Sequence, residues 1–309
     1  MARPAPRKHR RVAAPVLAAY DPLTRDRAPV RFGAAIAALA GTRLVVASVY
    51  ADDDVVDRLT GAQGEEDLTR DPQPALDAVL AELRAEGTEA DWSALGSASV
   101  AAALDLAVAA LGASLLVVGS ARGAASGHVS AGTTGQRLLS GAQRPVALVP
   151  RDWAGDAQRW LRDDVTTTIG AGLVHAAEGR AAVRSGQALA TRAGARMCVL
   201  TVVTPRAWMA GDDLADDVRR RAEDAADEDA GTPLGAPVDV DVVVGEPADA
   251  LIAASAELDM LVCGARRYGP PGGVLLGAVT RRLTAEAACP VIVLSRGDDA
   301  GLEALLAEA

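Results

Sequence analysis

Residues 115–139, LLVVGSARGAASGHVSAGTTGQRLL, carry the pattern with the clearest chemical meaning in the chain. An apolar run leads into a loop rich in Gly, Ala and Ser, and then into a segment of helical character. Backbone N–H groups at such a helix start bind phosphate oxygens. Glycine at 119 and 132 lets the backbone approach a ligand closely. The hydroxyls of Thr133 and Thr134 add donors for the same oxygens.

Other polar residues are expected beside this loop. Asp21 follows the first apolar run, where its carboxylate accepts hydrogen bonds from a ribose, and Arg122 reaches over the phosphates. Simpler interpretations stay open for each residue. Asp21 starts a turn with Pro22, Thr133 only caps the helix, and Arg122 is a solvated surface charge. His128 is interpreted as loop filler.

Several kinds of catalytic or binding site are excluded by the sequence. Lys8 is the only lysine, so the chain has no P-loop, and HExxH, GxSxG and CxxC motifs do not occur. The glycines of GAGLVH at 170–175 fall within a predicted strand rather than in a strand-to-helix turn. The two histidines beyond residue 11, His128 and His175, argue against a metal site or a catalytic triad. We therefore favour a protein that is not an enzyme.

The overall composition narrows the partners and the compartment. The net charge of −10, from 31 basic and 41 acidic residues, argues against nucleic acid as the main partner. The basic segment 1–11 is expected to be a disordered arm, and the nine-residue VAAPVLAAY is too short to span a membrane. Three cysteines without metal-ligand spacing indicate a reducing compartment, so we expect a cytoplasmic protein.

An internal repeat is the strongest feature of the sequence. ASLLVVGSARG at 113–123 matches LDMLVCGARRYG at 258–269 with an offset of 145 residues, which also aligns Pro145 with Pro290. The earlier segments match at an offset near 153: AGTRLVVASVY begins at residue 40 and AGARMCVLTVV at residue 193. A shared order of elements over some 135 residues predicts two domains built on one plan.

Each half is predicted to alternate strands with helices, which is typical of a parallel sheet covered on both faces. The predicted strands are 12–20, 43–50, 88–95, 114–118 and 145–149, then 168–174, 196–203, 237–244, 259–263 and 290–294. The predicted helices are 28–41, 72–87, 98–112 and 133–141, then 178–194, 211–230, 246–257 and 278–287. The fold class is therefore α/β, with two tandem five-stranded parallel-sheet domains; the family resemblance described below implies that they are of a Rossmann-like, nucleotide-binding type.

The predicted organisation of the chain has five parts. They are a basic arm (1–11), a first domain (12–150), a linker (151–164), a second domain (165–296) and a tail (297–309). For the tail, a short helix with leucines on one side and a solvated, frayed segment are both left open. In such sheets ligands bind at the carboxyl ends of the strands, near the point where strand order reverses.

These motifs resemble those of the universal stress protein family, in its tandem two-domain form. The resemblance covers about residues 12–150 and 165–296. It implies a five-stranded α/β domain that binds ATP in some members, and pairing through the last strand, here 145–149 and 290–294. That pairing occurs within one chain or in a homodimer. The nucleotide-binding residues implied for the first half are Tyr20, Asp21, Val49, Val118, Gly119, Ser120, Arg122, Gly132, Thr133 and Thr134.

The second half departs further from the family's motif. Gly264 and Gly277 are retained, but Arg267 replaces the middle glycine, Ala278 replaces the hydroxyl, and His175 stands near the position of the aspartate. Losing two hydrogen bonds of about 1 kcal/mol each lowers affinity roughly thirtyfold. We therefore expect ATP, with Mg²⁺ accompanying it, in the first half only.

Three hypotheses for the function follow. The first is a universal stress protein acting as a nucleotide-binding regulatory module in the stress response. The second is a scaffold that binds no nucleotide and acts through dimer and partner surfaces, which the arginines at 122 and 267 favour. The third is a slow ATP hydrolase. The acidic insertions at 51–72 and 205–232 differ between the halves, and such loops often carry specificity.

Overall fold

A computed structural model gives the fold of the chain. It describes residues 14–51, 71–155, 167–173, 177–203, 220, 238–264, 267–268, 275–295 and 302–307. The predicted basic arm lies outside these residues, as do most of the linker and most of the two acidic insertions.

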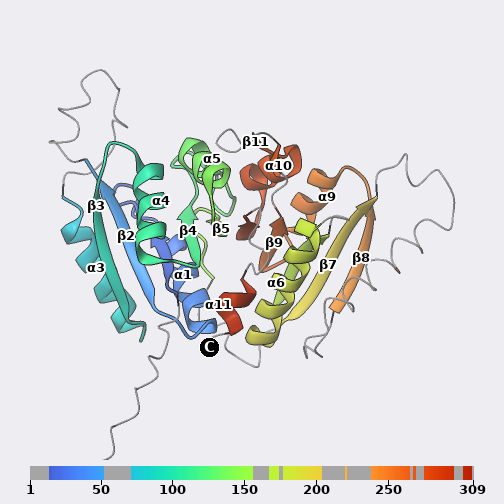
Figure 1. Ribbon diagram of the computed structural model, residues 1–309, viewed down its shortest axis with the longest axis horizontal. Coiled ribbons are helices and arrows are strands. Elements are labelled where there is room, and N and C mark those ends of the chain that lie inside the picture. Colours follow the sequence, from blue (N-terminus) through green and yellow to red (C-terminus); the bar gives the residue numbers. More distant parts are fainter. Residues whose placement is uncertain are drawn as a thin grey trace, which may run out of the picture.

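The centre of the molecule is one ten-stranded sheet (Figure 1). Its order is β3-β2-β1-β4-β5-β12-β9-β6-β7-β8, so each half contributes five consecutive strands. The strands of the first half are β1 (Val16–Ala19), β2 (Leu44–Tyr50), β3 (Ala90–Gly96), β4 (Leu115–Gly119) and β5 (Val146–Val149). Those of the second half are β6 (Thr168–Leu173), β7 (Arg196–Val203), β8 (Val238–Val244), β9 (Met260–Gly264) and β12 (Val291–Leu294).

Strands within each half run parallel, and the two halves join through one antiparallel pair, β5 with β12. In this pair Ala147 lies opposite Ile292, and both strands are fully buried. The Oγ of Ser295 adds a hydrogen bond of 2.5 Å to the carbonyl of Arg144 across the same junction. The pairing of the last strands is therefore intramolecular, and each is an interior strand of the sheet.

The helices form a layer on each face of the sheet because strand side chains alternate between the two faces. The first layer contains α1 (Ala28–Leu39), α3 (Gln73–Ala85), α6 (Ala177–Ala193) and α11 (Glu303–Ala307). The second contains α4 (Val100–Leu111), α5 (Gly132–Gly141), α9 (Pro247–Ala254) and α10 (Ala278–Glu286). Val16 and Ala18 of β1 face the first layer, whereas Leu17 faces the second.

Every strand predicted from the sequence is present, and the fold class is confirmed. Apolar runs bounded by turn residues mark buried parallel strands clearly, which explains this agreement. The structure adds a small antiparallel hairpin that the sequence did not predict, β10 (Arg267–Tyr268) with β11 (Leu275–Leu276). No helix of the described residues is long and apolar enough to cross a bilayer.

The C-terminal tail forms a docked helix rather than a frayed end. Leu302, Leu305 and Leu306 are buried, and α11 lies beside α6 near the middle of the molecule (Figure 1). Arg184 pairs with Glu303 at 2.9 Å, and Arg192 donates to the carbonyl of Leu306 at 2.8 Å. These leucines belong to the buried core of the first helix layer, and the tail docks on α6 of the second domain.

Removing apolar contact from the tail should destabilise the protein. We expect Leu305→Ala to lower the free energy of unfolding by about 2–5 kcal/mol, because it leaves a cavity in this core. Leu106 is 71% exposed, so Leu106→Ala is the matched control, with an expected change within about 0.5 kcal/mol. Urea denaturation followed by circular dichroism measures both. Equal midpoints for the two variants would contradict the docked tail.

All three cysteines are free and buried, and their pKa values are raised. Burial, with the Asp241 carboxylate 3.3 Å away, raises the pKa of Cys198 to about 12, and burial raises the pKa of Cys263 to about 12. The pKa of Cys289 is also raised, by burial and by Asp259. The nucleophilic thiolate is therefore suppressed in the folded protein.

We expect no fast-reacting thiol in the native protein at pH 8 and three after denaturation, measured with Ellman's reagent. The raised pKa values also fix the sign of a pH effect. Since the folded state holds these protons more tightly, stability is full below the ordinary thiol pKa of 9.0 and falls as the pH rises above it. A native thiol that reacts within seconds would contradict this burial.

Candidate functional site

The first domain has a pocket of about 720 Å³ at the carboxyl ends of β1, β2 and β4 and the N-terminus of α5. All ten residues that the resemblance implies for nucleotide binding line it. The lining comprises Ala19, Tyr20, Asp21, Thr24, Asp26, Pro29, Ala47, Val49, Val100, Leu104, Val118, Gly119, Ser120, Ala121, Arg122, Ala131, Gly132, Thr133, Thr134 and Gly135.

One part of this lining is apolar. It comes from the ends of three parallel strands and from α4: Ala19, Ala47, Val49, Val100, Leu104 and Val118. The remaining lining is mainly polar, with hydroxyl, carboxylate and guanidinium groups and the first turn of α5. A pocket with both characters suits a ligand that has an apolar end and a polar end.

Asp21 has two roles in this structure. Its Oδ1 accepts a hydrogen bond of 2.9 Å from the N–H of Leu23, so the turn expected after β1 is present. Its Oδ2 pairs with the Nε of Arg122 at 3.2 Å. Arg122 is therefore not a simple solvated charge. The two side chains remain 40% and 42% exposed, and an ion pair this exposed contributes about 0–1 kcal/mol.

Gly132 is required by the backbone at the start of α5. Its φ is +57°, a left-handed conformation that side chains with a Cβ disfavour, and a Cβ there would lie 2.9 Å from the Cβ of Ala121. Gly119 has a different reason, since its Cβ would lie 3.3 Å from the Cγ of Pro29. Both glycines therefore allow close packing beside the pocket.

The first turn of α5 faces the pocket with its backbone donors. The first helical hydrogen bond runs from the N–H of Gly135 to the carbonyl of Ala131 at 2.9 Å, so the N–H groups of Gly132, Thr133 and Thr134 precede it. The interpretation of Thr133 as an N-cap was wrong. The cap residue is Ala131, which makes no side-chain capping bond, and Thr133 is exposed.

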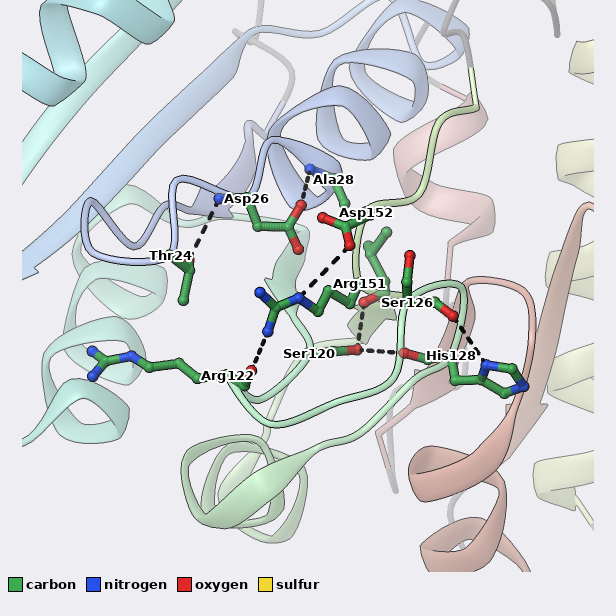
Figure 2. A network of polar contacts seen from close by, with 10 residues as sticks. Thr24, Asp26, Ala28, Ser120, Arg122, Ser126, His128, Arg151 and Asp152 are labelled. Carbon is green, nitrogen blue, oxygen red and sulfur yellow. Dashed lines mark hydrogen bonds and ion pairs between the residues drawn. The ribbon is translucent and has the colours of Figure 1, made fainter.

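Ser120 holds the loop together rather than presenting a spare donor. Its Oγ lies 2.8 Å from the carbonyl oxygen of Val149 and accepts a 3.0 Å hydrogen bond from the N–H of Ser130. A third contact joins it to the carbonyl of His128 at 3.2 Å (Figure 2). The hydroxyl therefore links β5 to both ends of the loop.

Arg151, just after β5, also shapes the loop. Figure 2 shows its guanidinium between Asp152 and the backbone of Arg122, whose carbonyl it contacts. The carbonyl of Arg151 accepts from the N–H of Gly127 at 2.8 Å, and its own N–H donates to His128 at 3.1 Å. This residue was predicted to lie in a linker that belongs to neither repeat, and its role was missed.

The second domain also contacts the loop. The N–H of Val129 donates to the carbonyl of Ala287 at 2.7 Å, and that of Ala131 to the carbonyl of Thr284 at 2.8 Å. Both acceptors lie at the C-terminal end of α10. Sequence reasoning treated the halves as separate sites and missed these bonds, because backbone carbonyls leave no signal in residue types.

The equivalent region of the second domain differs. Gly264 ends β9, but Arg267 lies in the β10–β11 hairpin instead of an open loop. Gly277 has φ −58°, whereas Gly132 has φ +57°, and the following Ala278 is exposed. His175 lies outside the described residues. The two halves thus share strands and glycines but not the conformation of the loop.

Comparison with known proteins supplies the family. Residues 14–150 and 168–295 each match the profile of the Universal stress protein family. The chain belongs to this family. None of the curated proteins with which the sequence was compared matches it.

Among solved structures, universal stress proteins resemble the whole chain in fold. A protein of Pseudomonas aeruginosa UCBPP-PA14 assigned to the family has a TM-score of 0.66 at 15% identity, covering 96% of this chain and 98% of its own. One from Archaeoglobus fulgidus DSM 4304 has a TM-score of 0.62 at 17% identity, covering 91% and 98%. A universal stress protein solved in complex with cAMP covers 42% of this chain and 98% of its own, at 24% identity and a TM-score of 0.34.

The pocket of this universal stress protein includes residues that the motifs did not indicate. Asp26 lies before α1, where its Oδ1 accepts from the N–H of Ala28 at 2.9 Å, and Thr24 precedes it (Figure 2). An aspartate that stands two residues before a helix, with a proline in the first helical turn, is a capping signal. This signal would have placed Asp26 just before α1. Within the described residues, no three metal-ligating side chains group together.

Removing the Ser120 hydroxyl should loosen the loop. We expect Ser120→Ala to lower the free energy of unfolding by about 1–3 kcal/mol, because it leaves part-buried backbone groups without their partner. The amide of Ser130 should then exchange its hydrogen faster. Ser126→Ala, at an exposed position of the same loop, is the control. Unchanged exchange at Ser130 in Ser120→Ala would contradict this role.

Proposed function

We propose that this universal stress protein is a nucleotide-binding regulatory module of the stress response that holds one adenine nucleotide in its first-domain pocket. The observation that carries the proposal is the convergence of ten residues, from three strand ends and one helix start, on a single cavity. In this proposal the second domain binds no nucleotide and serves as a structural partner. We place the protein in the cytoplasm, in keeping with its three free cysteines.

The character of the lining suggests how the nucleotide lies. The apolar part accepts the base, since an aromatic ring gains most from surfaces such as Val49, Leu104 and Val118. The phosphate lies against the first turn of α5, where unpaired N–H groups and the helix dipole attract negative charge. Asp21, between these two regions, accepts a hydrogen bond from a ribose hydroxyl.

The ion pair between Asp21 and Arg122 does not close the pocket to such a ligand. Because the pair is exposed and contributes about 1 kcal/mol at most, breaking it lowers affinity by roughly fivefold at most. A freed Arg122 guanidinium also gains a phosphate as a new partner. The proposed regulation then follows from mass action: a bound nucleotide stabilises the folded pocket and its contacts with the second domain.

The same ion pair favours a second candidate function. If Asp21 and Arg122 are bound to each other for structural reasons, the protein is a scaffold that acts through its surfaces and binds no nucleotide. The two functions are separated by titrating the purified full-length protein with AMP, ADP and ATP. Saturable binding of any one of these nucleotides supports the nucleotide-binding module. If none of the three binds, the result supports the scaffold.

A glycine pair provides the sharper test of the site. Gly132→Val should reduce adenine nucleotide affinity more than tenfold, because valine disfavours a φ of +57° and its Cβ meets Ala121. Gly123→Val is the control, since a Cβ there has no atom within 4 Å and the residue lies outside the lining. Isothermal titration calorimetry measures both, with circular dichroism to check folding. Wild-type affinity in a folded Gly132→Val protein would overturn the site.

A further inference from the structure

The loop between β4 and α5 uses most of its backbone donors within the protein. Seven of its N–H groups donate to protein acceptors: those of Ala121, Ala124, Gly127, His128, Val129, Ser130 and Ala131. Their partners include the loop itself, Arg151 beyond β5, and the carbonyls of Thr284 and Ala287 in the second domain. A phosphate chain wrapped by this loop would have to break several of these bonds, at about 1 kcal/mol or more each.

The course of the loop separates its middle from the pocket. From the end of β4 to the start of α5, only residues 118–122 and 131–135 line the cavity. The middle instead runs beside the chain after β5, where Ser126 forms a parallel bridge with Arg151 (Figure 2). The hydrogen bond from Val129 to Ala287 holds it against the second domain at 2.7 Å. The loop is therefore folded away from the place that a second or third phosphate would occupy.

The donors that remain at the anionic end match one phosphate group. They are the N–H groups of Gly132, Thr133 and Thr134 and the two threonine hydroxyls. The guanidinium of Arg122 joins them only when it exchanges Asp21 for the phosphate. A phosphomonoester has three non-bridging oxygens and a cyclic phosphate has two, and these groups satisfy either set. Further phosphates would meet fewer donors, because seven N–H groups of the adjoining loop, among them that of Ala121, already donate to protein acceptors.

The charges of the pocket lining also disfavour a ligand with more than one phosphate. Asp21 and Asp26 contribute two negative charges and Arg122 one positive charge, so the ionised side chains of the lining sum to −1. One oxygen of Asp26 is bonded to Ala28, and the other lies 4.0 Å from where a Cβ of Gly119 would stand, at the end of β4. Each added phosphate brings further negative charge toward these carboxylates, which is repulsive.

We infer that the first-domain pocket selects a nucleotide with a single phosphate group, a nucleoside monophosphate or its cyclic form, over the triphosphate. The inference rests on the proposed function and narrows its ligand class. ATP, the ligand expected from the sequence, would then bind through one phosphate, and its other two phosphates would meet few hydrogen-bond donors from the loop. The second domain acts as a specificity element, since two of its carbonyls keep the loop folded away.

A phosphate series tests the inference. The full-length protein, freed of nucleotide, is titrated by calorimetry with adenosine, AMP, cyclic AMP, ADP and ATP, in EDTA and again with Mg²⁺. We expect AMP or cyclic AMP to bind about threefold to tenfold more tightly than ATP, and more tightly than adenosine. The comparison of AMP with cyclic AMP identifies which form the site takes.

Each contrary result has a distinct meaning. ATP binding as tightly as both AMP and cyclic AMP, or more tightly, would overturn the single-phosphate inference while leaving the nucleotide-binding function in place. Adenosine binding as tightly as both monophosphates would also overturn it, because the phosphate would then have no partner. Absence of binding by every ligand would overturn the proposed function together with the inference.

A charge variant tests the role of the carboxylates. Asp26→Asn keeps the acceptor for Ala28 but removes one negative charge from the lining. We expect this variant to raise the affinity for ATP more than the affinity for AMP, so that the preference for AMP falls about threefold. Asp77→Asn removes the same charge from an exposed position of α3 and should leave the preference unchanged. An unchanged preference in Asp26→Asn would overturn the part assigned to charge.

Discussion

The antiparallel pairing of β5 with β12 is the constraint on which the rest of this structure depends. Each half is a five-stranded parallel sheet whose last strand would otherwise be an edge with unpaired backbone groups. Joining the two edges buries both strands completely and turns two small sheets into one. The same junction brings the C-terminal end of α10 to the loop of the first domain, where Thr284 and Ala287 accept its hydrogen bonds.

This arrangement gives the two copies of one plan different roles. In the first domain, the loop is held by β5, Arg151 and the second domain, and its ends line a pocket with an apolar part and a polar part. In the second, a hairpin occupies the corresponding segment and the glycine before α10 has ordinary backbone angles. A loop ordered in advance loses little entropy when a ligand binds. The proposed division of labour, a binding domain and a supporting domain, follows from this asymmetry.

Residue types predicted what depends on local pattern. Apolar runs such as 114–118 and 259–263 predicted the strands, and the resemblance carried by the glycine motif indicated ten of the residues that line the pocket. Contacts made by backbone groups could not be predicted in this way. The carbonyls of Thr284 and Ala287 have no signature in the sequence, and Arg151 lay in a segment that matched neither repeat. For Asp21 the predicted turn is present, its pairing with Arg122 was not predicted, and its contact with a ribose stays a prediction.

The central claim is that the first domain holds a nucleotide and the second does not. It is tested most directly by denaturing freshly purified protein and measuring the adenine nucleotide released per chain. We expect about one nucleotide per chain. About two would contradict the silent second domain, and none, together with no binding in titrations, would contradict the nucleotide site itself.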